Sequence, residues 1–258
     1  MLFDSLGHAT VDGNWLETSL DASFKSYSHE LTKNNYLGGL AVGLSHKNDY
    51  NHDSFIKNSD QYQNIYPIAG FDPLKEDLSS LAQIKKLGFY GIKLHPRFTG
   101  LDLKRDKEIL IECLNACGEI KIPVFLCSYF YCNLNNMPTY DPFFQLIDIL
   151  KQCLKTKVII VHGGGLEIMR YVELSRFNAN ILLDLSLVFM KYKNSSIDKD
   201  IQFLFESFDQ RISIGSDFPE YNLSEIQKRF DYFSKDISLE KRENIGFKNI
   251  TNFLGIIL

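Results

Sequence analysis

The sequence has no long apolar run, no cluster of positive charge and no even number of cysteines. Its longest apolar runs, such as 122–126 and 158–161, are far shorter than the ~20 residues that a membrane helix needs. The N-terminus reaches Asp4 almost at once, so it has no apolar core of a signal peptide. The net charge is −4, without a stretch rich in Lys and Arg. We therefore expect a cytoplasmic protein with neither a membrane nor a nucleic acid as partner.

The five cysteines are an odd number, which argues against a disulfide framework in a cytosolic chain. Cys113 and Cys117 are four positions apart within a helical pattern and share one face of it. We interpret them as buried structural thiols rather than as a metal or redox pair.

What the sequence does contain is a series of short apolar runs, separated by helix-like segments. The runs are rich in Ile, Val, Leu and Phe and are apolar on both faces, as strands are when helices cover both sides of a sheet. Eight such runs can be counted: 2–8, 37–44, 65–71, 89–94, 122–127, 157–162, 180–185 and 211–216.

Amphipathic segments between the runs predict helices over 74–87, 102–119 and 141–154. Asp72-Pro73 is typical of a helix start, and Gly88 of a helix end. A last helix is predicted over 239–254. Eight β–α units predict a (β/α)8 TIM barrel that forms a single domain over residues 1–258, with an extra C-terminal helix. An open, doubly wound sheet is the alternative.

Polar side chains stand at the carboxyl ends of several runs, and a barrel brings these ends together at one mouth. His162 lies in the block Val161–Gly165, and Asp217 lies in the block Gly215–Pro219. We expect His8, His95, His162 and Asp217 to converge there, and the other three histidines to lie on the surface. The glycines 163–165 form either a tight turn or a backbone site for an anion.

Lys93 and His95 are two positions apart on a predicted strand, so they share a face. If that face points into the barrel, both side chains reach the mouth and can bind a substrate. Lys93 and Arg97 can meet a carboxylate or phosphate on a small acidic substrate, and the alternative for Arg97 is that it faces solvent. The alternative is that His95 only closes its strand before Pro96.

Together, these motifs resemble the amidohydrolase superfamily, in its amidohydrolase 2 branch, which includes the aminocarboxymuconate-semialdehyde decarboxylase group. The resemblance covers nearly the whole chain. It is carried by the segments Phe3-Asp4, Gly91–Pro96, Ile122–Leu126, Val161–Gly165, Gly215–Pro219 and Asn249–Gly255.

The resemblance implies one divalent metal ion, usually zinc, at the barrel mouth. Its ligands would come from an Asp-x-His-x-His motif on strand one, a His at strand five and an Asp after strand eight. This sequence has Leu6 at the first His and Cys127 at the strand-five His. The implied set is then His8, Cys127 and Asp217, with His162 as general acid/base or further ligand. Thiolate is a good zinc ligand, whereas Leu6 cannot bind a metal.

Three functions follow from this pattern. The first is a metal-dependent hydrolase of an amide, ester or lactone, or a decarboxylase, acting on a small acidic substrate with Asp217 and His162 as catalytic residues. The second is a metal-free enzyme in which Asp217 and His162 alone act as an acid/base pair. The third is a non-catalytic barrel that binds a ligand or a partner protein. By analogy with the family, a homodimer is also expected.

Overall fold

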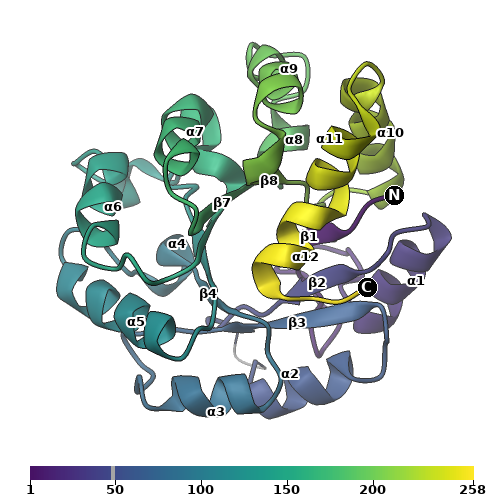
Figure 1. Cartoon of the computed structure of the whole chain (residues 1–258). Helices are drawn as coiled ribbons and strands as arrows, with labels where there is room; N and C mark the ends of the chain where they lie inside the picture. Colours follow the sequence, from purple (N-terminus) through teal and green to yellow (C-terminus); the bar gives the residue numbers. More distant parts are fainter. Residues whose placement is uncertain (48–49) are drawn as a thin grey trace.

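The protein, represented by a computed structural model that describes residues 1–47 and 50–258, is built around a cylinder of parallel strands (Figure 1). The strands follow one another around the cylinder in sequence order, β1 to β8, and every neighbouring pair is parallel. They are β1 (Asp4–Gly7), β2 (Gly39–Val42), β3 (Ile65–Gly70), β4 (Ile92–Leu94), β5 (Val124–Cys127), β6 (Val158–Val161), β7 (Ile181–Asp184) and β8 (Ile212–Ser213). Each lies within one of the eight predicted runs.

Backbone hydrogen bonds join the last strand to the first and bring the sheet round into a barrel. Ser5 N donates to Ile214 O at 3.1 Å, and Asp217 N donates to Leu6 O at 2.8 Å. His8 N then donates to Phe218 O at 2.7 Å. The (β/α)8 barrel is therefore confirmed, and the open sheet is not what this sequence forms.

Helices surround the barrel in Figure 1, because each crossover between parallel strands must pack its apolar face on the sheet. None of the described helices is long and apolar enough to cross a membrane. They are α1 (Phe24–Lys33), α2 (His52–Ser59), α3 (Ser80–Lys86), α4 (Pro96–Thr99), α5 (Lys107–Glu119), α6 (Pro142–Leu150), α7 (Ile168–Arg176), α8 (Val188–Lys191), α9 (Ile197–Ser207) and α10 (Leu223–Ser234).

The helix predicted to start at Asp72-Pro73 begins later, at Ser80. Asp72 Oδ1 accepts from Leu74 N at 3.1 Å, and Asp72 N donates to Glu76 Oε1 at 2.7 Å. These bonds satisfy the backbone of a turn, so the Asp caps the turn and not a helix. The predicted end is right, since Gly88 follows with φ +103°.

The extra C-terminal helix is present as α11 (Leu239–Glu243), a π-helical turn η4 (Asn244–Lys248) and α12 (Asn249–Leu254). Ile250, Phe253 and Ile256 belong to the same apolar cluster as the side chains inside the barrel, among them Leu6 and Phe125. Lys157 Nζ also donates to Phe253 O at 2.9 Å. The C-terminal segment therefore closes the end of the barrel opposite the mouth.

Candidate active site

The two blocks singled out in the sequence both leave the barrel through a left-handed backbone. His162 has φ +67° and Asp217 has φ +55°, a backbone conformation that residues other than Gly rarely adopt. Such strain persists where the surroundings impose it, and it is common at functional sites. The backbone thus turns both side chains sharply at the ends of β6 and β8.

Asp217 pairs with His8 across the closing seam of the barrel. His8 Nε2 lies 3.4 Å from Asp217 Oδ1, and His8 Nδ1 lies 2.8 Å from Val42 O. A carbonyl only accepts, so Nδ1 carries a hydrogen and Nε2 is the ring atom that faces Asp217. The His8 ring stacks on the Trp15 ring with centroids 5.3 Å apart.

The His8 contact keeps Asp217 ionised although the carboxyl is almost fully buried, with 7% of its surface exposed. Burial by itself would raise the pKa of Asp217, but the His8 hydrogen bond and the charges of His162, His8 and Lys93 lower it to about 2. Asp217 is therefore an anion at neutral pH, and a weak base.

His162 is held through one ring nitrogen and leaves the other open. Nδ1 lies 3.0 Å from Ser186 O and 3.1 Å from Ser186 Oγ. Burial lowers the pKa of His162 to about 4, against the opposing charge of Asp217. The ring is thus neutral at pH 7, with its hydrogen on Nδ1. Nε2 makes no hydrogen bond within the described part of the chain, so its lone pair is available as a base.

Asp184, at the end of β7, holds the serine that positions His162. It accepts from Ser186 Oγ, from Ser5 Oγ at 2.5 Å and from His162 N at 3.5 Å. Burial raises the pKa of this carboxyl, and the two serine hydroxyls oppose the shift. Asp184 therefore orients Ser186, which in turn orients the His162 ring.

Lys93 and His95 both reach the mouth from β4. The register pairs Lys93 with Phe125, a member of the cluster inside the barrel, so the Lys93 side chain also points inward. Nζ of Lys93 and Nδ1 of His95 are buried, and neither has a hydrogen-bond partner among the residues that the structure describes. Burial lowers the pKa of both groups. His95 also stacks on Phe98 at 4.1 Å.

The glycine block after His162 forms a tight turn. Gly163, Gly164 and Gly165 all have positive φ, and Gly164 N donates to Ser128 Oγ at 2.8 Å. A Cβ at Gly164 would overlap the ring of Tyr171, so this position requires glycine for space as well as for conformation. The Gly164 N–H is used within the protein and does not face an anion.

The implied metal ligands do not fit a divalent ion as they are placed. A zinc site needs three or more donors directed at one point. Within residues 1–47 and 50–258, no group of three or more His, Cys, Asp or Glu side chains is placed to hold a metal. Leu6 packs in the barrel interior, and the buried Lys93 side chain lies on the same inward face of the barrel as Cys127.

Several residues at the mouth were missed by sequence reasoning because they lie in loops without a strand-end signal. Trp15 covers His8, and its Nε1 donates to Glu220 Oε1 at 2.5 Å. His46, predicted to be a surface residue, is half-buried and contacts Phe98 in a tilted arrangement with ring centroids 4.2 Å apart. His52 is likewise half-buried, whereas His29 is exposed as predicted.

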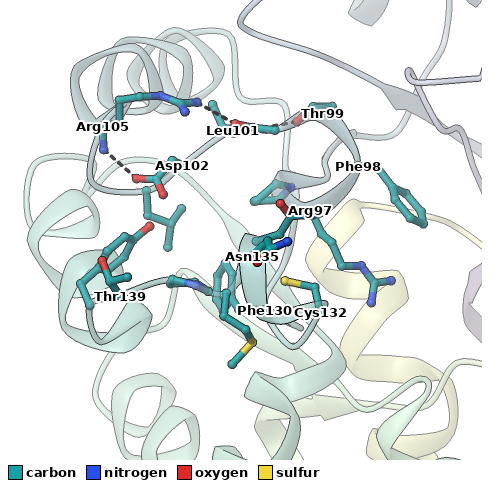
Figure 2. A pocket seen from close by; sticks show the side chains of 17 residues that line it. Arg97, Phe98, Thr99, Leu101, Asp102, Arg105, Phe130, Cys132, Asn135 and Thr139 are labelled. Atoms are coloured by element: carbon teal, nitrogen blue, oxygen red, sulfur yellow. Dashed lines mark hydrogen bonds between the residues drawn. The ribbon is translucent and has the colours of Figure 1, made fainter.

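A cavity of about 640 Å³ opens beside the mouth, between the segment that follows β4 and the loop that follows β5 (Figure 2). Its lining includes Arg97, Phe98, Phe130, Asn135 and Thr139. Arg97 stacks over Phe98 and also over Tyr129, which itself contacts the His162 ring edge-on. The cavity therefore adjoins the His162 side chain through Arg97 and Tyr129, and His162 is not among its lining residues.

Comparison with known proteins supports the sequence resemblance. A family model described as amidohydrolase matches residues 39–256, whereas no curated protein matches the sequence. An uncharacterised TIM-barrel protein from Bordetella bronchiseptica is similar in structure, with 19% identity and a TM-score of 0.74 over 91% of this chain and 83% of that one.

Two further solved structures bear functional names. A probable 2-pyrone-4,6-dicarboxylic acid hydrolase from Acinetobacter baumannii, with citric acid bound, has 20% identity and a TM-score of 0.70, over 98% of this chain and 99% of its own. The 5-carboxyvanillate decarboxylase from Sphingomonas paucimobilis has 9% identity and a TM-score of 0.66, over 99% of each chain. At these identities the likeness shows a shared fold. With the family model matching most of its length, the chain belongs to the amidohydrolase family, in the amidohydrolase 2 branch.

Proposed function

We propose that this protein is a hydrolase of a small, carboxylate-bearing lactone, ester or amide, and that His162 and Asp217 perform its proton chemistry. The observation that carries this proposal is the pairing of a neutral His162, open at Nε2, with an ionised Asp217 at the same barrel mouth. A neutral base beside a fixed anion is what activation of a water molecule requires.

The mechanism follows from the protonation states. Asp217, with a pKa of about 2, accepts a hydrogen bond from the water and orients it. His162 Nε2 takes the proton as the water oxygen attacks the substrate carbonyl carbon. The Nδ1–H bond to Ser186 O holds the ring in this tautomer and supports the imidazolium that forms. That imidazolium then returns the proton to the leaving oxygen or nitrogen, which completes hydrolysis.

The neighbouring structures suggest the size and charge of the substrate. 2-Pyrone-4,6-dicarboxylic acid is a cyclic ester with two carboxyl groups, and citric acid has three. Arg97, at the cavity beside the mouth, makes no ion pair with the described carboxylates. A ring-containing dicarboxylate would match both the aromatic side chains and the positive charge at this rim.

The pKa of His162 favours hydrolysis over decarboxylation. Decarboxylation leaves a carbanion that needs a proton donor, and a ring with a pKa of about 4 is unprotonated at neutral pH. The first step of hydrolysis instead needs an acceptor for the proton of the attacking water. The neutral His162 ring is such an acceptor before the reaction starts.

Turnover of a substrate panel tests the proposal. The panel contains aromatic lactones, esters and amides with and without carboxyl groups, 2-pyrone-4,6-dicarboxylic acid among them, with 5-carboxyvanillate as a decarboxylation substrate. We expect hydrolysis of a carboxylated member, and a loss in kcat of about 10²–10⁴-fold in His162→Gln and in Asp217→Asn.

His29→Gln is the matched control, since this exposed histidine lies on α1 away from the mouth. Full activity in both mouth variants would exclude the acid/base roles. Release of CO2 from 5-carboxyvanillate without any hydrolysis would favour the decarboxylase. No turnover of any member, with a protein partner that co-purifies stoichiometrically, would favour the non-catalytic barrel.

A further inference from the structure

The Lys93 side chain is the buried group that the proposed proton chemistry leaves unused. Only 1% of its surface is exposed, and its Nζ has no hydrogen-bond partner among the residues described. A buried amine without a hydrogen-bond partner lowers the stability of the fold. Proteins retain such groups where a ligand completes them.

The surroundings of Lys93 are those expected of a metal ion in this barrel. The strand register places Lys93, Cys127 and Asp184 on the inward face of the barrel, because Lys93 lies beside Phe125 and both Cys127 and Asp184 lie beside Val161, and Phe125 and Val161 belong to the interior cluster. Asp217 pairs with His8 at the same mouth. The amine therefore shares this interior with Cys127 and Asp217, the groups to which the family resemblance assigns a cation.

His95 adds a second unpartnered atom on the same strand face. It lies two positions after Lys93, so both side chains point to the mouth, and its Nδ1 is also buried without a partner in the described chain. Stacking on Phe98 fixes the ring. Two buried groups without hydrogen-bond partners, the Lys93 amine and the His95 imidazole, therefore lie where one anionic group could bind both.

We propose that Lys93 replaces the metal ion in this barrel, so that its mouth binds an anionic oxygen group on Lys93 and His95 in place of a divalent cation. The proposal rests on the proposed function for its chemistry: Lys93 would stabilise the oxyanion formed when water attacks the carbonyl. It adds to that function the residues that bind the anionic oxygen of the substrate, Lys93 and His95. The misfit of the metal ligands and the orphaned amine then have one explanation.

Binding without turnover tests this inference. The probe is isophthalate, a planar dicarboxylate, with its neutral diamide as the uncharged counterpart. Trp15 is the single tryptophan of the chain and stacks on His8, so its fluorescence reports events at the mouth. We expect isophthalate, and not the diamide, to change this fluorescence at millimolar concentration. Calorimetry provides an independent measure of affinity.

Lys93→Gln and Lys93→Met should each weaken isophthalate binding by about tenfold or more. Lys93→Met keeps the apolar stem, so it serves if the first variant does not fold. Lys155→Gln, an exposed lysine that pairs with Glu119, is the matched control and should bind normally. Unchanged binding in both folded Lys93 variants, or no binding of isophthalate to the wild type, would overturn the inference.

Metal titration provides the opposing test. We expect wild-type protein dialysed against zinc to retain far less than one equivalent, and cobalt to give no sulfur-to-metal charge-transfer band. One bound equivalent that is lost in Cys127→Ser would overturn the inference, because the metal would then coexist with Lys93. A failure here is separate from a failure of the proposed function, which the kcat of His162→Gln decides without reference to Lys93.

Discussion

Asp4, at the start of β1, is a carboxyl buried at the seam of the barrel. It accepts from Ser216 N at 2.7 Å, from Ser216 Oγ at 2.5 Å and from Tyr27 OH at 2.8 Å. Burial nevertheless dominates and raises the pKa of Asp4 to about 7, against these hydrogen bonds. The residue therefore titrates near neutrality in the folded protein, without any catalytic role being needed to explain it.

The raised pKa of Asp4 predicts a pH-dependent stability with a definite sign. Between pH 4 and 7 the folded state holds a proton on Asp4 that the unfolded chain has lost, so the free energy of unfolding falls as pH rises. The loss attributable to this group is at most ~4 kcal/mol. Asp4→Asn cannot titrate and should lack this component.

Urea denaturation at pH 4.5 and pH 7.5 measures the difference. We expect the free energy of unfolding of Asp4→Asn to rise relative to wild type as the pH increases. Parallel pH profiles for the two proteins would contradict the assignment. Asp77→Asn is a control, because this fully exposed carboxyl lies on the surface before α3.

At this scale, sequence reasoning identified the strand-end residues but not all of their partners. His162 and Asp217 each follow an apolar run, and the predicted barrel brings His8 and Asp217 to one mouth. The hydrogen bonds from Asp184 through Ser186 to His162 depend on side-chain placement in the folded barrel, which no local pattern encodes. Cys127 was assigned from the family motif, yet ligation depends on where Lys93 points, and that follows from the register of β4 and β5.

Among the elements, the turn after β6 is the one whose backbone most directly sets the site. Gly164→Ala should lower stability by ~2–5 kcal/mol, because a methyl group would overlap Tyr171 in a left-handed backbone. It should also move His162 and reduce kcat.

Gly100→Ala separates the two causes. Gly100 has φ +77°, but a Cβ added there would have no atom within 4 Å. The Gly100→Ala variant should therefore lose only ~1–2 kcal/mol of stability, from the backbone strain alone, and keep its activity. Thermal denaturation of both variants measures this, and equal losses would show that the Tyr171 overlap is relieved at little cost.

Strands were easier to predict than helix boundaries. The eight runs are continuous because both faces of each strand are buried, so composition alone marks them. Helix starts depend on single hydrogen bonds: Asp141 does cap α6 by accepting from Phe143 N at 2.9 Å, whereas Asp72 caps a turn. The two aspartates are each followed by proline, so only the structure distinguishes them.

For the whole molecule, the C-terminal segment is part of the barrel core. Removal of residues 249–258 would expose the interior cluster that Ile250, Phe253 and Ile256 cover. At ~2–5 kcal/mol for each buried side chain, this loss is comparable to the stability of an entire domain. We expect the truncated chain to lose its cooperative thermal transition, as followed by circular dichroism.

A shorter truncation is the control. Ile257 and Leu258 are exposed, at 93% and 51%, so their deletion should leave the transition temperature unchanged. A cooperative transition near the wild-type temperature in the longer truncation would mean that the barrel is closed without α12.

The seam between β1 and β8 also dictates when the active site can exist. Asp4 and Ser216, which bond across it, are 212 positions apart in the sequence. During synthesis β1 can pair with β2 early, but seven strands must leave the ribosome before β8, which closes the barrel against β1, emerges. His8 therefore lacks its Asp217 contact for most of translation, and a nascent chain stalled before β8 has His8 and His162 but neither Asp217 nor the Glu220 that holds Trp15.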